Sequence, residues 1–469
     1  MRRKEREVLE NIEIETIAAE GKAIAHVNGK VLFVPFAIPG DIVNVLVTRK
    51  KSGYMEGIVL EITTPSRDRS EPFCSHYGTC GGCKWQPLPY PLQLKFKEQQ
   101  VIDQLERIGK LSLPEVTPIL GSEKTKFYRN KLEYTFSRKR WIESKDEMQM
   151  LSEKDLLGLG FHVTGYFDKV LDIEKCYLQE EPSNSIRLFI KDFAVKNDYP
   201  FFDLREQSGF LRNIVIRTST TTEVMLIVVF AYEDKELRTK LLDALIREFP
   251  QITSLNYVIN GKKNDTISDL PCYTYSGKDS IFEVMENLKF RIGPKSFYQT
   301  NSEQAYRLYS IVRDFASLKG NEIVYDLYTG TGTIALFLSS LAKKVIGVEY
   351  VTEAIEDAWI NAKENKVDNC LFYAGDMKDI LTPIFLKENG KPDVIVLDPP
   401  RAGIHPDVAK VIVEAEPDKI VYVSCNPATQ ARDIALMNEK YTITKVQPVD
   451  MFPHTHHLEN VVLMEKKNI

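Results

Sequence analysis

The most regular hydrophobic pattern in the chain lies in residues 291–469, where short apolar, β-branched runs alternate with longer amphipathic windows. Such runs are typical of buried parallel strands, and the window 352–366 places its apolar residues on one helical face. We therefore predict a doubly wound parallel α/β sheet, closed by a final antiparallel strand. The expected strands are 323–326, 345–349, 371–374, 394–398, 420–424, 443–446 and 460–464.

Residues 1–66 follow a different pattern, in which short alternating segments are separated by turns. Asn28-Gly29 is a strong signal for a two-residue hairpin. Five expected strands in so short a stretch favour a small barrel, a common support for single-stranded nucleic acid. These strands are 12–14, 23–27, 31–34, 43–47 and 57–62.

The middle of the chain is less regular. Residues 67–98 form a cysteine-rich linker, a helix is expected from Tyr90 to about Gly109, and 99–290 read as a mixed α+β domain. Residues 127–136 alternate like a strand and interleave basic with aromatic side chains. Such a face suits phosphate contact and base stacking, which makes Lys131 a candidate RNA contact, although an ordinary half-buried strand would look similar.

Composition narrows the class of protein. The 469 residues are 43% hydrophobic and 27% charged, with a net charge of −5, as in a soluble globular protein. No apolar run approaches membrane-spanning length, and the N-terminal residues do not resemble a signal peptide, so we expect a cytoplasmic protein without a membrane partner. The net charge does not exclude nucleic acid, because local basic runs are present, each also compatible with a solvated surface. They include Arg2–Lys4, Arg49–Lys51 and Arg138–Arg140.

Three of the seven cysteines fall within ten residues, in the spacing C-x5-C-x2-C. They are Cys74, Cys80 and Cys83, and Cys176 is the plausible fourth ligand. Thiolates at this spacing can wrap a soft metal centre, and Gly81-Gly82 lets backbone N–H groups point at sulfur. The pattern favours an iron–sulfur cluster; structural zinc and a metal-free loop are the alternatives. The spacing differs from the C-x3-C-x2-C of radical enzymes, so we do not expect this cluster to cleave a methyl donor.

A glycine-containing loop, 326–333, follows the first strand of the C-terminal sheet and opens a helix. Glu349 ends the next strand, where an acid can accept a ribose hydroxyl. The loop lacks the third glycine of a pyrophosphate-binding motif. Together with Gly375-Asp376 after the third strand, the loop fits S-adenosylmethionine better than a dinucleotide cofactor. A dinucleotide stays possible.

Three further positions carry the expected chemistry. Cys425 ends an apolar strand before Asn426-Pro427, where it is either an inert thiol or a nucleophile. Asp398, followed by two prolines, is fixed at the same sheet edge. Glu459 begins an apolar strand, where burial would raise its basicity. For the nearby histidines we expect hydrogen-bonding and packing roles rather than metal binding.

These motifs resemble a known family. Asp398–Arg401, Ser424–Pro427 and Phe452–Glu459 are similar to the RNA uracil-5-methyltransferases of the TrmA/RumA family, and residues 21–25 and 36–41 resemble a TRAM RNA-binding domain. The likeness implies a Rossmann-like methyltransferase domain with an OB-like barrel and a central α+β domain. It implies Cys425 as nucleophile, Glu459 as base, Asp398 on the uracil edge and Phe297 stacked on the extruded base. It also implies a 4Fe–4S cluster on Cys74, Cys80, Cys83 and Cys176, and a methyl-donor site lined by Gln299, Tyr328, Thr333, Glu349, Asp376 and Asp398.

The resemblance is strongest to the RumA branch, which implies a 23S ribosomal RNA substrate and a monomeric enzyme. Three alternatives stay open at this point. The same chemistry would serve a transfer RNA uridine. A non-catalytic RNA-binding protein would use the barrel and a zinc knuckle. An amino-methyltransferase also has a proline pair after its fourth strand, and would need no cysteine nucleophile.

Overall fold

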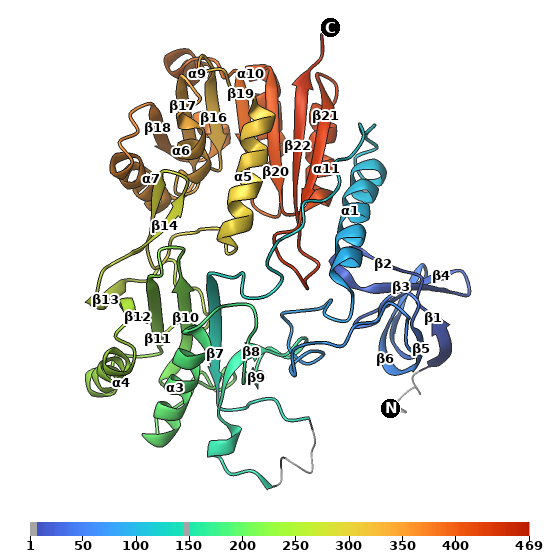
Figure 1. Cartoon of the computed structure of the whole chain (residues 1–469), viewed down its shortest axis with the longest axis vertical. Coiled ribbons are helices and arrows are strands. Elements are labelled where there is room, and N and C mark those ends of the chain that lie inside the picture. The colour runs from blue at the N-terminus through green and yellow to red at the C-terminus, as the bar shows by residue number, and fades with distance from the viewer. Residues whose placement is uncertain (1–6, 144–147, 149, 469) are drawn as a thin grey trace.

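The computed structural model describes residues 7–143, 148 and 150–468, and its elements form three larger sheets and one hairpin (Figure 1). The basic run Arg2–Lys4 lies outside the described residues. Among the helices that the structure describes, none has the length and apolar character needed to cross a bilayer.

The N-terminal sheet has six strands in the order β1-β5-β6-β4-β3-β2 and encloses a small core of its own. All five expected strands are present, and the two-residue β2 is additional. Gly57 lets β6 pass close to β5, because a Cβ there would lie 2.2 Å from Val45 Cγ1. The elements are β1 Val8–Glu13, β2 Thr16–Ile17, the 3₁₀ turn η1 Ala19–Gly21, β3 Ala23–Val27, β4 Lys30–Val34, β5 Ile42–Lys50 and β6 Tyr54–Thr64.

The central domain is a mixed seven-stranded sheet in the order β13-β12-β11-β10-β7-β8-β9. The strand predicted over 127–136 is wrong in its first part: β7 begins at Lys131, because Phe127 has a left-handed backbone with φ 56°. The elements are β7 Lys131–Ser137, η2 Lys154–Leu156, β8 Gly158–His162, β9 Val170–Asp172, α3 Ser183–Lys196, β10 Leu211–Thr218, β11 Val224–Phe230, α4 Lys235–Glu248, β12 Ile252–Ile259 and β13 Cys272–Gly277.

The C-terminal sheet has seven strands in the order β18-β17-β16-β19-β20-β22-β21. The seven expected strands and the helices between the first six are confirmed. The final strand is antiparallel as predicted, but it inserts between β20 and β21 instead of closing an edge. Its residues 459–464 are buried, as this interior position requires.

The strands of this sheet are β16 Ile323–Leu327, β17 Lys344–Glu349, β18 Cys370–Ala374, β19 Val394–Leu397, β20 Lys419–Ser424, β21 Tyr441–Val449 and β22 Glu459–Lys466. Its helices are α5 Ser302–Ala316, α6 Thr333–Ser339, α7 Thr352–Glu364, α8 Met377–Ile380, α9 Pro383–Asn389, α10 Pro406–Ala415 and α11 Pro427–Met437.

Two elements from earlier in the chain join this domain. Helix α1 (Tyr90–Arg107) buries Val101 and Leu105 in the core beneath α11, beside β21 (Figure 1). The hairpin of β14 (Ile281–Met285) and β15 (Leu288–Ile292) packs beside α7, whose Asn361 side chain accepts the Arg291 N–H at 2.8 Å. The C-terminal sheet is therefore packed by a helix and a hairpin that precede it in the chain.

Candidate active site and cysteine centre

The candidate site lies at one edge of the C-terminal sheet, where parallel strands end together. Leu327 of β16 pairs with Leu397 of β19, which pairs with Tyr422 of β20. The loops that follow these strands therefore meet at their carboxyl ends, the edge at which open α/β sheets bind ligands.

The loop after β16 turns sharply into α6. Tyr328 has φ 67° and Gly332 φ 79°, and a Cβ on Gly332 would lie 3.0 Å from Ala358 Cβ and from the Phe372 ring. At Gly330 a Cβ would meet no atom within 4 Å, so the loop backbone there faces open space. The Gly330 N–H donates to a Glu349 carboxylate oxygen at 3.2 Å. The conformation thus allows a ligand to approach the backbone closely.

Of the remaining predicted donor-site residues, Tyr328 and Thr333 belong to this loop and the helix that follows it, Asp376 and Asp398 follow β18 and β19, and Gln299 precedes α5. Burial raises the pKa of Tyr328 to about 12, and the negative charges of Asp376, Asp433 and Glu349 add to the effect. Thr333 is buried in the first turn of α6. Gln299 is also buried, and its backbone oxygen accepts from the Asn130 side chain at 2.9 Å.

The two predicted substrate-binding residues differ in exposure. The Phe297 side chain is 70% exposed, as a residue that stacks on an incoming base requires. Lys131 begins β7, where it pairs with Arg217 of β10, and is half-buried. Burial lowers its pKa, and the charge of Arg217 lowers it further. Lys131 thus keeps part of its side chain accessible, and its role as an RNA contact stays a prediction.

The predicted nucleophile and the predicted base lie at the ends of one strand pair. Ser424 of β20 pairs with Asn460 of β22, so the next residues outward, Cys425 and Glu459, lie opposite each other. Glu459 is 4% exposed, and its Oε2 has no hydrogen-bond partner among the described residues. Burial raises its pKa well above the ordinary range, and Asp398 raises it further. An unpartnered, basic carboxylate in this position can accept a proton.

Burial also raises the pKa of the Cys425 thiol to about 12, and the charges of Glu459 and Asp398 contribute. Arg401 opposes this, since its positive charge lowers the pKa of Cys425 and of Glu459. Its guanidinium lies 3.2 Å from His457 Nδ1, and its backbone oxygen accepts from Asn426 Nδ2 at 3.1 Å. Arg401 thus lies at the candidate site, although the sequence analysis assigned it no role. Its position directly after the proline pair could have indicated this.

The loop between β21 and β22 carries Glu459 and is held by buried polar contacts. Lys97 of α1 and Asp450 are both 0% exposed, and the Lys97 ammonium lies 2.6 Å from Asp450 Oδ1. Asp450 also accepts from the Tyr90 hydroxyl at 2.8 Å and from the Phe452 N–H at 3.0 Å. Helix α1 therefore anchors the start of the loop.

His454, at the tip of this loop, contacts the N-terminal half. Its N–H donates to Gln93 Oε1 at 2.8 Å, and its carbonyl accepts the N–H groups of Lys84 and Trp85. Burial lowers the pKa of His454 to about 4, of His456 to about 3 and of His457 to about 4. The histidines are neutral near pH 7 and serve in hydrogen bonding and packing, as expected.

The four predicted cluster cysteines line one cavity of about 350 Å³. Apolar side chains, including Leu132 and Phe161, complete its wall, and the Gly82 N–H donates to Cys80 Sγ at 3.5 Å. Burial raises the pKa of Cys83 to about 12 and of Cys176 to about 11, and the other thiols contribute. A cationic metal centre would hold such thiols as thiolates. Within the described ranges, no group of three His, Cys, Asp or Glu side chains has an arrangement that could hold a metal ion.

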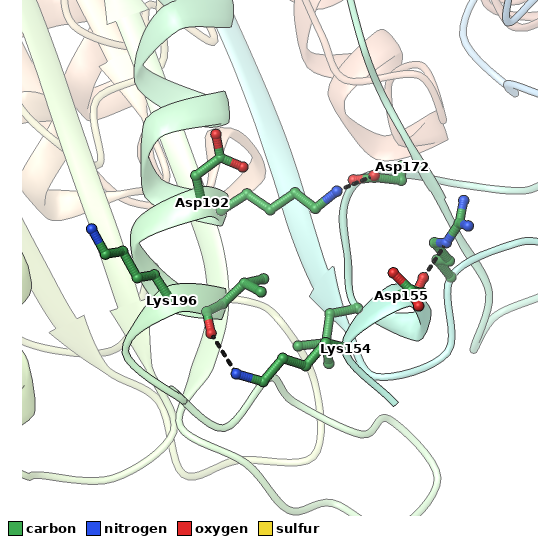
Figure 2. A pocket seen from close by; sticks show the side chains of 9 residues that line it. Lys154, Asp155, Asp172, Asp192 and Lys196 are labelled. Atoms are coloured by element: carbon green, nitrogen blue, oxygen red, sulfur yellow. Dashed lines mark hydrogen bonds and ion pairs between the residues drawn. The ribbon is translucent and has the colours of Figure 1, made fainter. Parts of the chain in front are cut away.

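A second cavity, of about 430 Å³, opens between α3 and the loop around η2. Some of its charged side chains engage neighbouring groups: Lys191 pairs with Asp172, and Lys154 donates to the Val195 carbonyl at 3.4 Å (Figure 2). It shares no lining residue with the cysteine cavity or the sheet edge. We assign it no part in the chemistry.

The fold and the site define a Rossmann-like methyltransferase with appended RNA-binding and cysteine-rich modules, and similar proteins agree. Residues 278–467 match the tRNA (Uracil-5-)-methyltransferase family, and residues 2–60 match the TRAM domain. An uncharacterized RNA methyltransferase of Bacteroides thetaiotaomicron is 58% identical over 96% of this chain and 100% of its own length. One from Porphyromonas gingivalis is 55% identical over 97% and 99%.

A solved structure of Pyrococcus abyssi tRNA (uracil-54, C5)-methyltransferase, in complex with S-adenosyl-L-homocysteine, superposes with a TM-score of 0.74. It is 28% identical and covers 97% of this chain and 100% of its own. The chain belongs to the TrmA/RumA family of RNA (uracil-5-)-methyltransferases and is an RNA methyltransferase.

Proposed function

We propose that this enzyme transfers a methyl group from S-adenosylmethionine to C5 of a uracil in RNA through a covalent adduct with Cys425. The observation that carries the proposal is the register that sets Cys425 opposite Glu459, with Asp398 and Arg401 beside them. A nucleophile, a base and an orienting acid are the groups that methylation of this unreactive carbon needs.

The methyl donor fits the loop 328–333. The open backbone at Gly330, Thr333 at the start of α6 and the carboxylate of Glu349 suit a nucleoside ligand, and Asp376 and Gln299 complete the donor set. The S-adenosyl-L-homocysteine bound to the Pyrococcus relative supports the same choice. S-adenosylmethionine supplies an electrophilic methyl group on its sulfonium.

The protein residues then act in order on the uracil. The Cys425 thiolate adds to C6, and the C5–C6 π electrons move to O4 as an enolate. C5 takes the methyl group, whose bond to the donor sulfur breaks. Glu459 removes the C5 proton, the C5–C6 double bond re-forms, and the C6–sulfur bond breaks to release the thiolate. Asp398 orients the uracil edge, and Phe297 stacks on the extruded base.

Arg401 stabilises the thiolate in this scheme. Burial opposes ionisation of Cys425, and the carboxylates of Glu459 and Asp398 oppose it further. Arg401 is the one described cation whose charge acts in the other direction there. His457 holds the guanidinium through a neutral Nδ1 acceptor at 3.2 Å. Arg401→Met should therefore slow adduct formation, with little change in donor binding.

For the cysteine centre, the proposal is a 4Fe–4S cluster on Cys74, Cys80, Cys83 and Cys176. The shared cavity, its apolar wall and the backbone N–H directed at sulfur support this donor set. The cluster would have a structural role, since its ligand Cys83 directly precedes Lys84 and Trp85, whose N–H groups bind the His454 carbonyl.

The substrate that we favour is 23S ribosomal RNA, on the likeness to the RumA branch. Transfer RNA is the second candidate, because the Pyrococcus relative, which acts on transfer RNA, matches across 97% of this chain. Mapping 5-methyluridine in unmodified transcripts of both RNAs, treated with purified protein, decides between them. Transfer RNA methylation alone would contradict the ribosomal assignment, and 5-methyluridine in neither would contradict the reaction.

The adduct is tested with two variants and one matched control. Cys425→Ala should bind the methyl donor and transfer nothing, whereas Cys272→Ala, at a half-buried thiol of β13, should keep its turnover. Glu459→Gln should stall after methyl transfer and leave a protein–RNA adduct on a denaturing gel. Normal methylation by Cys425→Ala would refute the mechanism.

A further inference from the structure

A small aromatic–lysine patch adjoins the cysteine cavity, whose wall includes three of its residues, and reaches the loop that carries Glu459. It consists of Phe73, Lys126, Phe127, Lys175 and Tyr177. The Phe73 ring lies 5.4 Å from that of Tyr177, whose ring is 6.0 Å from that of Phe127. The three rings are half-buried and the two lysines are exposed. The patch therefore exposes both aromatic ring surface and positive charge to solvent.

The lysines of the patch sit over aromatic faces rather than against carboxylates. Lys126 Nζ lies 4.0 Å from the Phe73 ring centroid, and Lys175 Nζ lies 5.0 Å from that of Tyr177. Within the described part of the chain, neither lysine has a carboxylate within 4.0 Å. By contrast, the neighbouring Lys124 is paired with Glu303 at 2.7 Å. The ammonium groups are thus held in place yet left available to an anion.

The backbone is strained where it presents this patch. Phe127 has φ 56°, a conformation that bulky residues seldom adopt. Its N–H donates to the Tyr177 carbonyl at 2.7 Å, which fixes the two segments side by side. Such outliers persist where surrounding contacts over-determine them and are frequent at ligand-binding positions.

The patch is continuous with the proposed active site. The Phe73 ring lies 5.0 Å from the ring of His454, and the charge of Lys126 contributes to the lowered pKa of that histidine. His454 belongs to the loop that ends at Glu459. A ligand on the patch would therefore lie beside the segment that positions the base.

We propose that this patch binds unpaired RNA next to the target uridine, with bases on the aromatic rings and phosphates at Lys126 and Lys175. The inference rests on the proposed function, because a uracil extruded for reaction leaves unstacked neighbours that must be held. Aromatic faces receive any base, and lysines receive phosphate without reading sequence.

The experiment measures binding of a fluorescein-labelled oligouridine by fluorescence anisotropy over a series of salt concentrations. Lys126→Met keeps an apolar stem over Phe73 and removes the charge, and Lys175→Met does the same at Tyr177. Each should weaken binding and lower the slope of log Kd against log salt by about 0.7, the contribution of one single-strand phosphate contact. Phe127→Leu should weaken binding about fivefold or more with the slope unchanged.

Lys240→Met, at an exposed lysine of α4, is the matched control and should leave both affinity and slope unchanged. Wild-type affinity and slope in both patch lysine variants would overturn the inference, as would an equal loss for an oligouridine–oligoadenosine duplex. Methylation by the wild-type enzyme is measured in a separate assay. The patch can therefore fail to bind RNA while the proposed methylation of uracil still stands.

Discussion

Replacing Lys97 by Met should destabilise the protein strongly, because it leaves Asp450 charged and buried. Lys97 and Asp450 are each 0% exposed and lie 2.6 Å apart. Removal of one partner of a buried ion pair typically costs about 3–5 kcal/mol. Asp450 would keep its bonds from the Tyr90 hydroxyl and the Phe452 N–H, so we expect a loss near the lower end of that range, about 3 kcal/mol.

Urea unfolding followed by tryptophan fluorescence measures this loss. Trp85 is a local reporter, because its ring centroid lies 5.6 Å from the Lys97 ammonium. Lys410→Met is the matched control: the Lys410–Glu414 pair is 3.8 Å long with both side chains mostly exposed, so its removal should cost less than about 0.5 kcal/mol.

A second variant separates charge burial from packing. Lys97→Met combined with Asp450→Asn removes both charges, and Asn can still accept from the Tyr90 hydroxyl. Most of the lost stability should return, because neither residue then carries an unpaired charge. A loss below about 1 kcal/mol in Lys97→Met, or no recovery in the double variant, would refute the argument that the buried ion pair anchors this loop.

Three further predictions concern titration and metal content. The single-turnover methylation rate should rise with pH by up to about tenfold per pH unit near neutrality, because the pKa of Cys425 is raised to about 12 and the pKa of Glu459 is also raised. A rate that does not change with pH would count against thiolate chemistry. Stability should fall as pH drops from 6.5 towards about 4, because the unfolded chain protonates His454 and His457 before the folded protein does; His457→Gln should flatten the dependence of the thermal midpoint on pH. Cys83→Ser should lose the visible absorption and iron content of the cluster, whereas Cys272→Ser should keep both.

Hydrophobic periodicity was sufficient to predict most of the C-terminal sheet, because buried parallel strands and amphipathic helices differ clearly in period. It could not place the last strand. Residues 460–464 predict a buried strand in either an edge or an interior position, and only the pairing with both β20 and β21 distinguishes the two. Alternation likewise failed at Phe127, since no residue pattern signals a left-handed phenylalanine.

The candidate site was predictable where short motifs carry it. Cys425, Asp398 and Glu459 each stand at a strand end, and the sheet brings those ends together. Lys97 was not predictable, because its partner Asp450 lies 353 residues away and a lysine in an amphipathic helix is usually exposed. At Lys131 the alternating pattern fitted both an RNA-contacting face and an ordinary half-buried strand, and the half-buried side chain does not distinguish the two.

The docking of the β21–β22 loop onto α1 limits how this catalytic domain could be transplanted. A fragment beginning at residue 278, where the family match starts, would retain Cys425 and Glu459 in one sheet. It would lack Lys97 and Gln93, and would leave Asp450 and His454 without their partners in α1. A chimaera joining the fragment to a foreign RNA-binding module would therefore have to import the helix of residues 90–107 as well.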